Sequence, residues 1–222
     1  MAALTVLRTR RLTRSFGGLT AVRDVDFNLV DREIHALIGP NGAGKTTLVS
    51  LLCGRLAPSS GDIAFKGTDI TRLPAEARVR LGIAYTFQIT SIYARLTVIE
   101  NVILAVQRSG THALDERARA ILRRVDLDRS ADRRAGTLAY GHQRLLEIAM
   151  GLALDPSLLI LDEPTQGLAE GEIEAFKALI REVATRATVL LIEHNMDLVM
   201  DLADRISVLN FGEILARGTP EE

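Results

Sequence analysis

Residues 39–47 constrain the fold of this chain more than any other part of its sequence. They read GPNGAGKTT and match the pattern G-x-x-x-x-G-K-T of a phosphate-binding loop. An apolar segment that we expect to be a strand precedes the loop, and a segment of helical pattern, residues 46–52, follows it. A strand, a glycine-rich turn and a helix N-terminus direct several backbone N–H groups at one point, where small residues let the backbone approach a polyphosphate. The segment therefore predicts a nucleotide hydrolase.

Two side chains of this loop are expected to act on the nucleotide directly. Lys45 would reach the β- and γ-phosphates, and the Thr46 hydroxyl would bind Mg²⁺. The other residues of the loop that we expect to contact the nucleotide are Asn41, Gly42, Ala43, Gly44 and Thr47. A glycine-rich turn that binds nothing is the alternative, and the Lys-Thr pair directly after the last glycine argues against it.

The order of the expected elements indicates an α/β core that a helical segment interrupts. We expect strands at residues 4–11, 22–29, 34–38, 61–67 and 83–87. Residues 97–154 show helical periods and no convincing strand. Strands are then expected at 158–161 and 189–192, helices at 170–183 and 196–203, and a final hairpin pairing 205–209 with 213–216. We therefore expect one domain, residues 1–222, with a helical subdomain at about 97–154 inserted in the core.

Polar side chains end several of the expected core strands. Parallel strands bring their C-terminal ends to the edge that carries the phosphate-binding loop, so these side chains are expected around the nucleotide. Asp162 would hold Mg²⁺ through water, and Glu163 would orient or deprotonate the attacking water. His194 would donate to the γ-phosphate, and Gln88 would contact both Mg²⁺ and water. Solvation of strand ends is the alternative for the two carboxylates, and the nearby loop argues against it.

Charge and hydropathy restrict the classes of partner. The net charge is −1, so bulk charge does not predict nucleic-acid binding. Arginines cluster near the N-terminus and at residues 123–134; such runs are usually solvated faces, and a basic segment beside a membrane surface is the alternative. No apolar run approaches the roughly 18 residues of a membrane span, and arginines stand where a signal peptide would need its apolar core. We expect a cytoplasmic protein unless a partner holds it elsewhere.

These motifs, in this order, resemble the nucleotide-binding domain of ATP-binding cassette (ABC) transporters over nearly the whole chain. Residues 39–47 match its Walker A motif, and residues 138–144 match its signature motif. Asp162 matches the end of its Walker B motif, and Glu163 matches its catalytic Glu. Gln88 matches its Q-loop, and His194 matches its switch histidine. Phe16 matches the aromatic residue that stacks on adenine, a core phenylalanine being the alternative.

The resemblance implies a fold, a cofactor set and a set of partners. The fold is a P-loop NTPase core with an antiparallel β subdomain and an inserted all-helical subdomain, and the cofactors are ATP and Mg²⁺. The signature helix of one subunit completes the site of a second ABC subunit, so Ala139, Tyr140 and Gly141 would contact the nucleotide in trans, in a homodimer or heterodimer. Transmembrane permease subunits would hold the protein peripherally at the cytoplasmic face of the cell (inner) membrane. A periplasmic or extracellular solute-binding protein would act indirectly, and no nucleic acid is expected.

Residues 138–149, LAYGHQRLLEIA, narrow the resemblance to the ATPases of branched-chain amino acid importers, which carry Tyr where most of the superfamily has Gly. Two positions depart from the pattern. The signature serine that bonds the γ-phosphate is Ala139 here, and the end of the D-loop, usually Asp or a similar polar residue, is Ala169. One lost hydrogen bond to a charged group costs about 1.5–3 kcal/mol, which would weaken the composite site without abolishing it.

We therefore expect an ATPase that powers a membrane importer for branched-chain amino acids or related small polar solutes. The segment 89–96 carries an apolar patch of Ile89, Ile92, Tyr93 and Leu96, and the resemblance places a permease helix there; inward packing on the helical subdomain is the alternative. A soluble ABC ATPase of DNA repair or translation would need a long coiled-coil insertion or a second cassette. A nucleotide-binding ABC module with weak or no turnover is a third reading, which Ala139 and Ala169 motivate and Glu163 and His194 oppose.

Overall fold

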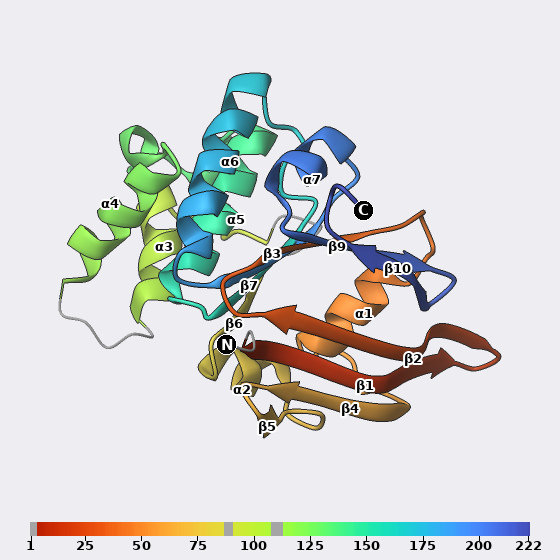
Figure 1. The fold of residues 1–222 in the computed structure, drawn as a ribbon. Coiled ribbons are helices and arrows are strands. Elements are labelled where there is room, and N and C mark those ends of the chain that lie inside the picture. The colour runs from red at the N-terminus through yellow and green to blue at the C-terminus, as the bar shows by residue number, and fades with distance from the viewer. Residues whose placement is uncertain (1–3, 87–90, 108–112) are drawn as a thin grey trace.

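Two β-sheets form the frame of the protein (Figure 1). The computed structural model describes residues 4–86, 91–107 and 113–222. The first sheet is antiparallel, in the order β2-β1-β4-β5, and comprises β1 (Thr5–Phe16), β2 (Leu19–Val30), β4 (Ser60–Phe65) and β5 (Thr68–Asp69). The second, in the order β10-β9-β3-β8-β7-β6, comprises β3 (Ile34–Ile38), β6 (Ile83–Tyr85), β7 (Leu158–Asp162), β8 (Thr188–Ile192), β9 (Arg205–Asn210) and β10 (Glu213–Gly218). Its strands are parallel except for the β9–β10 hairpin.

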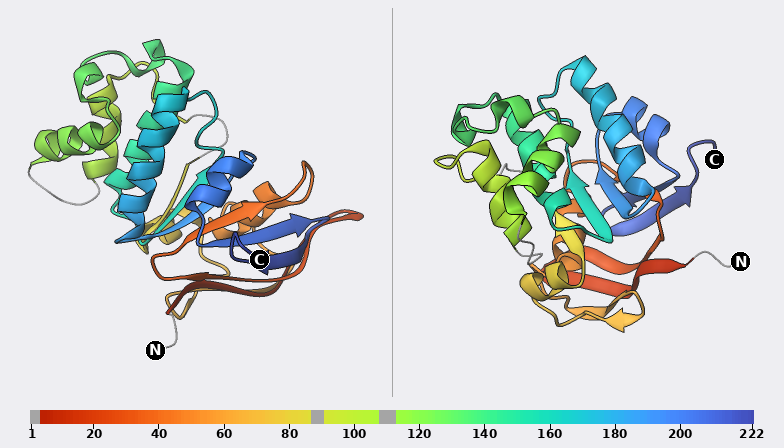
Figure 2. Two further views of the ribbon diagram at one scale, coloured as in Figure 1. Left: turned by 45° about the horizontal axis from the view of Figure 1, so that its top comes forward. Right: turned by 90° about the vertical axis from the view of Figure 1, so that its left-hand side faces the viewer.

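Helices cover both faces of the second sheet. Helix α1 (Lys45–Leu52) lies between the two sheets, and α2 (Ala75–Arg80) follows the antiparallel sheet in the chain. On the opposite face gather α3 (Val98–Val106), α4 (Leu114–Arg124), α5 (Tyr140–Ala153), α6 (Glu170–Ala184) and α7 (Met196–Leu202) (Figures 1 and 2). Short 3₁₀ turns at Asp128–Ser130 and Ala135–Thr137 connect α4 to α5.

The central strands are apolar along their whole length because both of their faces are covered. In β7, Leu159 and Leu161 join the core beneath the helices, whereas Leu158 and Ile160 point to the core that contains α1. Strand β8 divides its residues between the same two cores in the same alternating manner. The C-terminal ends of β7 and β8 are therefore held firmly from both sides.

This arrangement confirms the expected α/β fold class. Helices α3, α4 and α5 follow one another between β6 and β7; the boundaries of a subdomain at about 97–154 stay a prediction. The expected strands at 4–11 and 22–29 were too short, because Gly17 and Gly18 turn a continuous hairpin instead of interrupting it. Helix α2 and strand β5 were not expected, since elements this short carry little periodic signal. The end of the expected strand 83–87 lies outside the described residues.

The helix that follows the phosphate-binding loop ends against a buried arginine. Arg78 of α2 is 1% exposed, and its Nη1 donates to the carbonyl oxygens of Leu51 (2.7 Å) and Leu52 (2.9 Å). Its Nε and Nη2 donate to the carbonyls of Leu73 and Thr71, at 2.9 and 3.1 Å. A cation at a helix C-terminus both satisfies the last carbonyls and interacts favourably with the helix dipole. Arg78 thus joins α1 to the segment that leads into α2.

We predict that Arg78→Ala lowers the free energy of unfolding by about 2–4 kcal/mol, because it leaves buried carbonyls unpaired and opens a cavity. Urea unfolding monitored by circular dichroism measures this. Arg80→Ala is the matched control, since Arg80 is an exposed arginine on the same helix, and it should change stability by less than about 0.5 kcal/mol. Equal losses in the two variants would contradict the assigned role of Arg78.

Candidate active site

The backbone of the phosphate-binding loop is wedged between neighbouring strands. Gly44 has φ +103°, and a Cβ there would overlap the carbonyl oxygen of Ala21 in β2. Gly39 has φ +151°, and a Cβ there would overlap the carbonyl oxygen of Leu209 in β9. Only glycine fits both the conformation and the space at these two positions. The Gly212 N–H, in the β9–β10 turn, donates to the Ala43 carbonyl at 2.8 Å, which further holds the loop.

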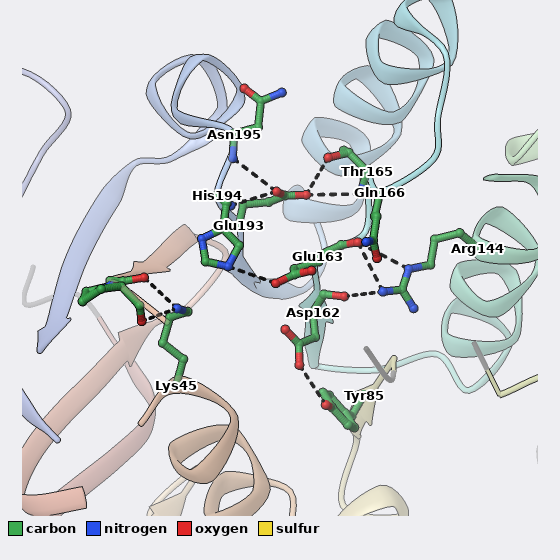
Figure 3. A network of polar contacts seen from close by, with 12 residues as sticks. Lys45, Tyr85, Arg144, Asp162, Glu163, Thr165, Gln166, Glu193, His194 and Asn195 are labelled. Atoms are coloured by element: carbon green, nitrogen blue, oxygen red, sulfur yellow. Dashed lines mark hydrogen bonds and ion pairs between the residues drawn. The ribbon is translucent and has the colours of Figure 1, made fainter. Parts of the chain in front are cut away.

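The Lys45 ammonium group lies inside this loop. Its Nζ donates to the carbonyl oxygens of Gly39 (2.6 Å) and Pro40 (3.0 Å) (Figure 3). Burial lowers the pKa of Lys45, and the nearby carboxylates of Glu163 and Asp162 raise it. Phosphate oxygens could replace the two carbonyls as acceptors without moving the lysine backbone. The predicted contact of Lys45 with the β- and γ-phosphates is compatible with this position.

Asp162 ends β7 and is 3% exposed. The Tyr85 hydroxyl donates to its Oδ2 at 3.1 Å (Figure 3). Burial is the largest influence on the Asp162 carboxyl and raises its pKa, whereas the Tyr85 hydrogen bond lowers it. Tyr85 was not identified from the sequence, because the pairing of β6 with β7 that brings it there cannot be read from the chain order.

Glu163 adopts a left-handed backbone conformation, φ +49°, directly after the strand. Its N–H donates to the Ile192 carbonyl at 2.8 Å, and its carboxylate Oε1 lies 2.9 Å from Nε2 of His194 (Figure 3). A non-glycine residue pays about 1–2 kcal/mol for this conformation, which persists only where neighbours impose it. The side chains of Glu163 and His194, 20% and 45% exposed, face one another at the sheet edge.

Glu193 connects the segments that follow β7 and β8. It is 4% exposed, and its Oε1 accepts hydrogen bonds from the N–H (3.1 Å) and hydroxyl (2.6 Å) of Thr165 (Figure 3). Its Oε2 accepts from the His194 N–H at 3.0 Å. Glu193 was missed in the sequence because a carboxylate beside a candidate histidine has no signal of its own. Its hydrogen bonds join Thr165 and His194 across the two segments.

A cleft of about 450 Å³ lies over the loop. The predicted residues that line it are Phe16, Asn41, Gly42, Ala43, Gly44, Lys45, Thr46, Thr47, Asp162, Glu163 and His194. Phe16 is 43% exposed at its rim, and the Arg14 guanidinium lies 4.6 Å from the ring centroid. The structure thus brings together the two ends of the predicted site, an aromatic face and a group of charged side chains.

The described ranges contain no cluster of three or more His, Cys, Asp or Glu side chains that could hold a metal ion. A cation in this cleft would instead depend on the Thr46 hydroxyl, on Asp162 and on phosphate oxygens. Oxygen donors of this kind suit Mg²⁺, which usually keeps several waters and takes few protein ligands. The residues present therefore fit Mg²⁺, whose binding stays a prediction.

The remaining predicted residues lie elsewhere. Ala139, Tyr140 and Gly141 are at the N-terminal end of α5 and do not line the cleft. The Tyr140 hydroxyl donates to Oε1 of Gln166 at 3.2 Å, so this helix end contacts the segment after β7. Gln88 lies outside the described residues. Over the part of the chain that is described, no helix has the length and apolarity needed to span a bilayer.

Known proteins resemble this chain at the levels of family, sequence and fold. Residues 22–166 match the family model described as ABC transporter. The "High-affinity branched-chain amino acid transport ATP-binding protein LivG" of Salmonella typhimurium is 42% identical, covering 98% of this chain and 92% of the relative. BraF of Pseudomonas aeruginosa, with the same description, is 40% identical at the same coverage. The ADP conformation of MJ1267, an ATP-binding cassette of an ABC transporter, superimposes with a TM-score of 0.87 at 30% identity, covering 97% of this chain and 91% of that one.

We predict that Tyr85→Phe moves the acid limb of the ATP hydrolysis profile to higher pH. Removing the hydroxyl removes an interaction that lowers the Asp162 pKa, so the carboxylate becomes protonated at a higher pH. One hydrogen bond of about 0.5–1.5 kcal/mol corresponds to a shift of up to about one pH unit. Phosphate release measured from pH 5 to 9 at saturating ATP tests this. An acid limb that stays in place or moves to lower pH would separate Tyr85 from Asp162.

Proposed function

The chain belongs to the ABC transporter family, and we propose that it is the ATP-hydrolysing subunit that powers a membrane importer for branched-chain amino acids or related small polar solutes. As a cassette of this family it binds ATP and hydrolyses it. The substrate class rests on the likeness to the branched-chain amino acid transport ATPases along nearly the full chain. ATPase subunits do not themselves contact the transported solute, so no residue here is assigned to it.

The observation that carries the chemistry is the placement of Glu163. Its carboxylate stands at the sheet edge beside the phosphate-binding loop, 2.9 Å from His194 Nε2. We assign Glu163 as the group that orients the attacking water and accepts its proton. His194 holds this carboxylate and donates to the γ-phosphate. The left-handed backbone of Glu163 directs the side chain to the cleft, away from the strand axis.

The other proposed contacts are of two kinds, charged or polar groups around the phosphates and an aromatic ring against adenine. Lys45 donates to the β- and γ-phosphates, and the backbone N–H groups of the loop surround them. When bound, Mg²⁺ neutralises charge on the phosphates; Thr46 and Gln88 would hold it directly, and Asp162 through water. Phe16 stacks on adenine, and the Arg14 guanidinium lies over the same ring, 4.6 Å from its centroid. None of these groups reacts covalently, so the proposed catalysis combines proton transfer to Glu163 with positioning and electrostatic stabilisation.

A second ABC subunit completes the proposed site. The first turn of α5 offers its backbone N–H groups to an anion, and Ala139 at its N-cap has no side-chain oxygen to occupy them. In trans, Ala139, Tyr140 and Gly141 would face the γ-phosphate bound by the partner. The missing hydroxyl at Ala139 makes this contact weaker than a serine would, so we expect the dimer to need ATP.

Among the described residues of the 89–96 segment, 91–96, Tyr93 is the one best placed to contact a permease. The residue is 58% exposed, and buried Asn101 holds its backbone, accepting from its N–H at 2.8 Å and donating to its carbonyl at 3.2 Å. Ile92 packs partly against the helical core, as the inward alternative expects for that side chain, and Ile89 lies outside the described residues. We propose that a cytoplasmic helix of the permease docks on Tyr93 and holds the subunit peripherally at the membrane.

We predict that Glu163→Gln keeps nucleotide affinity and lowers phosphate release by about 10²–10⁴-fold, the usual contribution of a general base. Phosphate release and fluorescent-nucleotide titration on the same preparations measure the two effects. Turnover of the variant near that of the wild type would show that Glu163 is not the general base. If the wild-type chain binds ATP without releasing phosphate, even with its permease, the chain is a nucleotide-binding module instead.

We predict that Tyr93→Asp prevents co-purification of the subunit with its permease and leaves ATP affinity unchanged. A buried carboxylate without a partner would oppose docking, whereas the exposed position tolerates the charge in the free subunit. Phe211→Asp is the matched control, because Phe211 is an exposed aromatic residue (82%) on the distant β9–β10 turn. Retention of the permease by Tyr93→Asp, or its equal loss in both variants, would contradict docking at Tyr93.

A further inference from the structure

The N-terminal end of the signature helix α5 is attached to the Walker B segment of its own chain. Besides the Tyr140 hydrogen bond to Gln166, the backbones of Gly141 and Gly167 approach so closely that a Cβ on Gly141 would lie 2.5 Å from the Gly167 carbonyl oxygen. One position further along, His142 Nε2 lies 2.9 Å from Oε1 of Glu172. The helix that is proposed to face the partner's nucleotide is therefore not free to move independently of its own catalytic segment.

Arg144 makes the most direct of these contacts. Its side chain is fully buried, and its Nη2 donates to the carbonyl oxygens of Asp162 (2.7 Å) and Glu163 (3.2 Å) (Figure 3). Its Nη1 pairs with Oε2 of Glu147 at 2.8 Å, one turn along the same helix. A planar guanidinium can serve two carbonyls and a carboxylate at once, which an ammonium group cannot.

These bonds hold the backbone of Glu163 from the side opposite to β8. Its N–H is bound to Ile192 of β8 and its carbonyl to Arg144 of α5. Rotation of the peptide after Glu163 out of the left-handed conformation would break the Arg144 bond and turn the carboxylate away from His194. The strained conformation of the catalytic residue thus has an identifiable partner that maintains it.

We propose that Arg144 is a positioning residue that sets the carboxylate of Glu163 in its own subunit, although it belongs to the helix whose first turn faces the partner's nucleotide. This inference rests on the proposed function. It follows that each signature helix contacts two ATP sites, that of the partner through residues 139–141 and its own through Arg144. One helix thus connects the two sites, and a displacement of α5 would displace the backbone of Glu163 with it.

Arg144→Lys tests the positioning role. Lysine keeps the charge, but its ammonium group cannot bind both carbonyls in the same plane. We expect kcat to fall by about 100-fold, the effect of a small misplacement of a catalytic group, while KM and nucleotide affinity change by less than about twofold. Arg78→Lys is the control for stability, because it alters another buried arginine that binds carbonyls away from Asp162 and Glu163. Arg78→Lys should lower the thermal midpoint of unfolding about as much as Arg144→Lys does, and it should leave both kcat and KM near their wild-type values.

A double variant, Arg144→Met with Glu147→Leu, guards against misfolding of the lysine variant. Replacing a buried ion pair by apolar residues of similar size is often neutral for stability, yet it removes the same carbonyl contacts. We expect the double variant to fold, to bind ATP and to show the same loss of kcat. A folded double variant or Arg144→Lys variant with wild-type kcat would overturn the inference.

Mixed dimers test whether Arg144 acts within its own subunit. In a dimer assembled from two copies of this chain, Lys45→Ala in one copy leaves a single working site, formed by the phosphate-binding loop and Glu163 of the other. Arg144→Lys on the subunit that supplies Glu163 should then reduce phosphate release by about 100-fold. On the subunit that supplies only its signature helix, it should reduce release by less than about threefold. The reverse pattern would show that Arg144 acts through the partner's nucleotide and would overturn the inference.

The wild type and Glu163→Gln are measured in parallel. Absence of turnover in the wild type would contradict the proposed function itself. Normal wild-type turnover, loss in Glu163→Gln and normal turnover in the Arg144 variants would leave the proposed function intact and contradict only the role of Arg144.

Discussion

Parallel pairing of β7, β8 and β3 aligns the phosphate-binding loop with Glu163 and His194. Asp162 is paired with Ile192, and Ile192 with Leu37, so the ends of the three strands stand in one row across the sheet. The phosphate-binding loop starts within two residues of that row, and Glu163 and His194 also lie within two residues of it. A slip of this register would separate the carboxylate from the loop, and the apolar side chains that fill both cores oppose such a slip. The packing of the sheet is thus also the alignment of the site.

Buried charged side chains complete what the sheet begins. Arg78 and Arg144 donate mainly to backbone carbonyls, and Glu193 accepts from backbone N–H groups and a hydroxyl. None of these three side chains lines the cleft over the phosphate-binding loop. They satisfy the polar backbone of helix ends and of segments that have no regular secondary structure. Loops held in this manner can keep a conformation such as that of Glu163, which a mobile loop would relax.

The sequence was most informative where chemistry requires a local pattern. The loop at residues 39–47 and the acids at the end of an apolar strand need particular neighbours in the chain, and the structure has the elements on which they were expected. The contacts of Tyr85, Glu193 and Arg144 could not be predicted in this way, although Arg144 lies in the signature motif, since their partners are distant in sequence and are met only after the strand order is known. Likewise, the hairpin of β1 and β2 was underestimated because a glycine pair marks either a break or a tight turn. Long-range pairing, rather than residue type, separates what was predicted from what was not.

The position of β3 has a consequence for the synthesis of the chain. Ala36 pairs with Leu191 on one side and with Ile206 on the other, so both neighbours of the strand that leads into the phosphate-binding loop come much later in the chain. On the ribosome, Ala36 is made 155 residues before Leu191 and 170 residues before Ile206, so the strand stays without its partners while that length of chain is synthesised. During that interval its backbone N–H and C=O groups are unpaired on both edges and its apolar side chains are uncovered, so other nascent chains or a chaperone can bind it. Nucleotide affinity should therefore appear abruptly once β9 has been made. A chain that stops before β9 should be bound by chaperones and should not bind ATP.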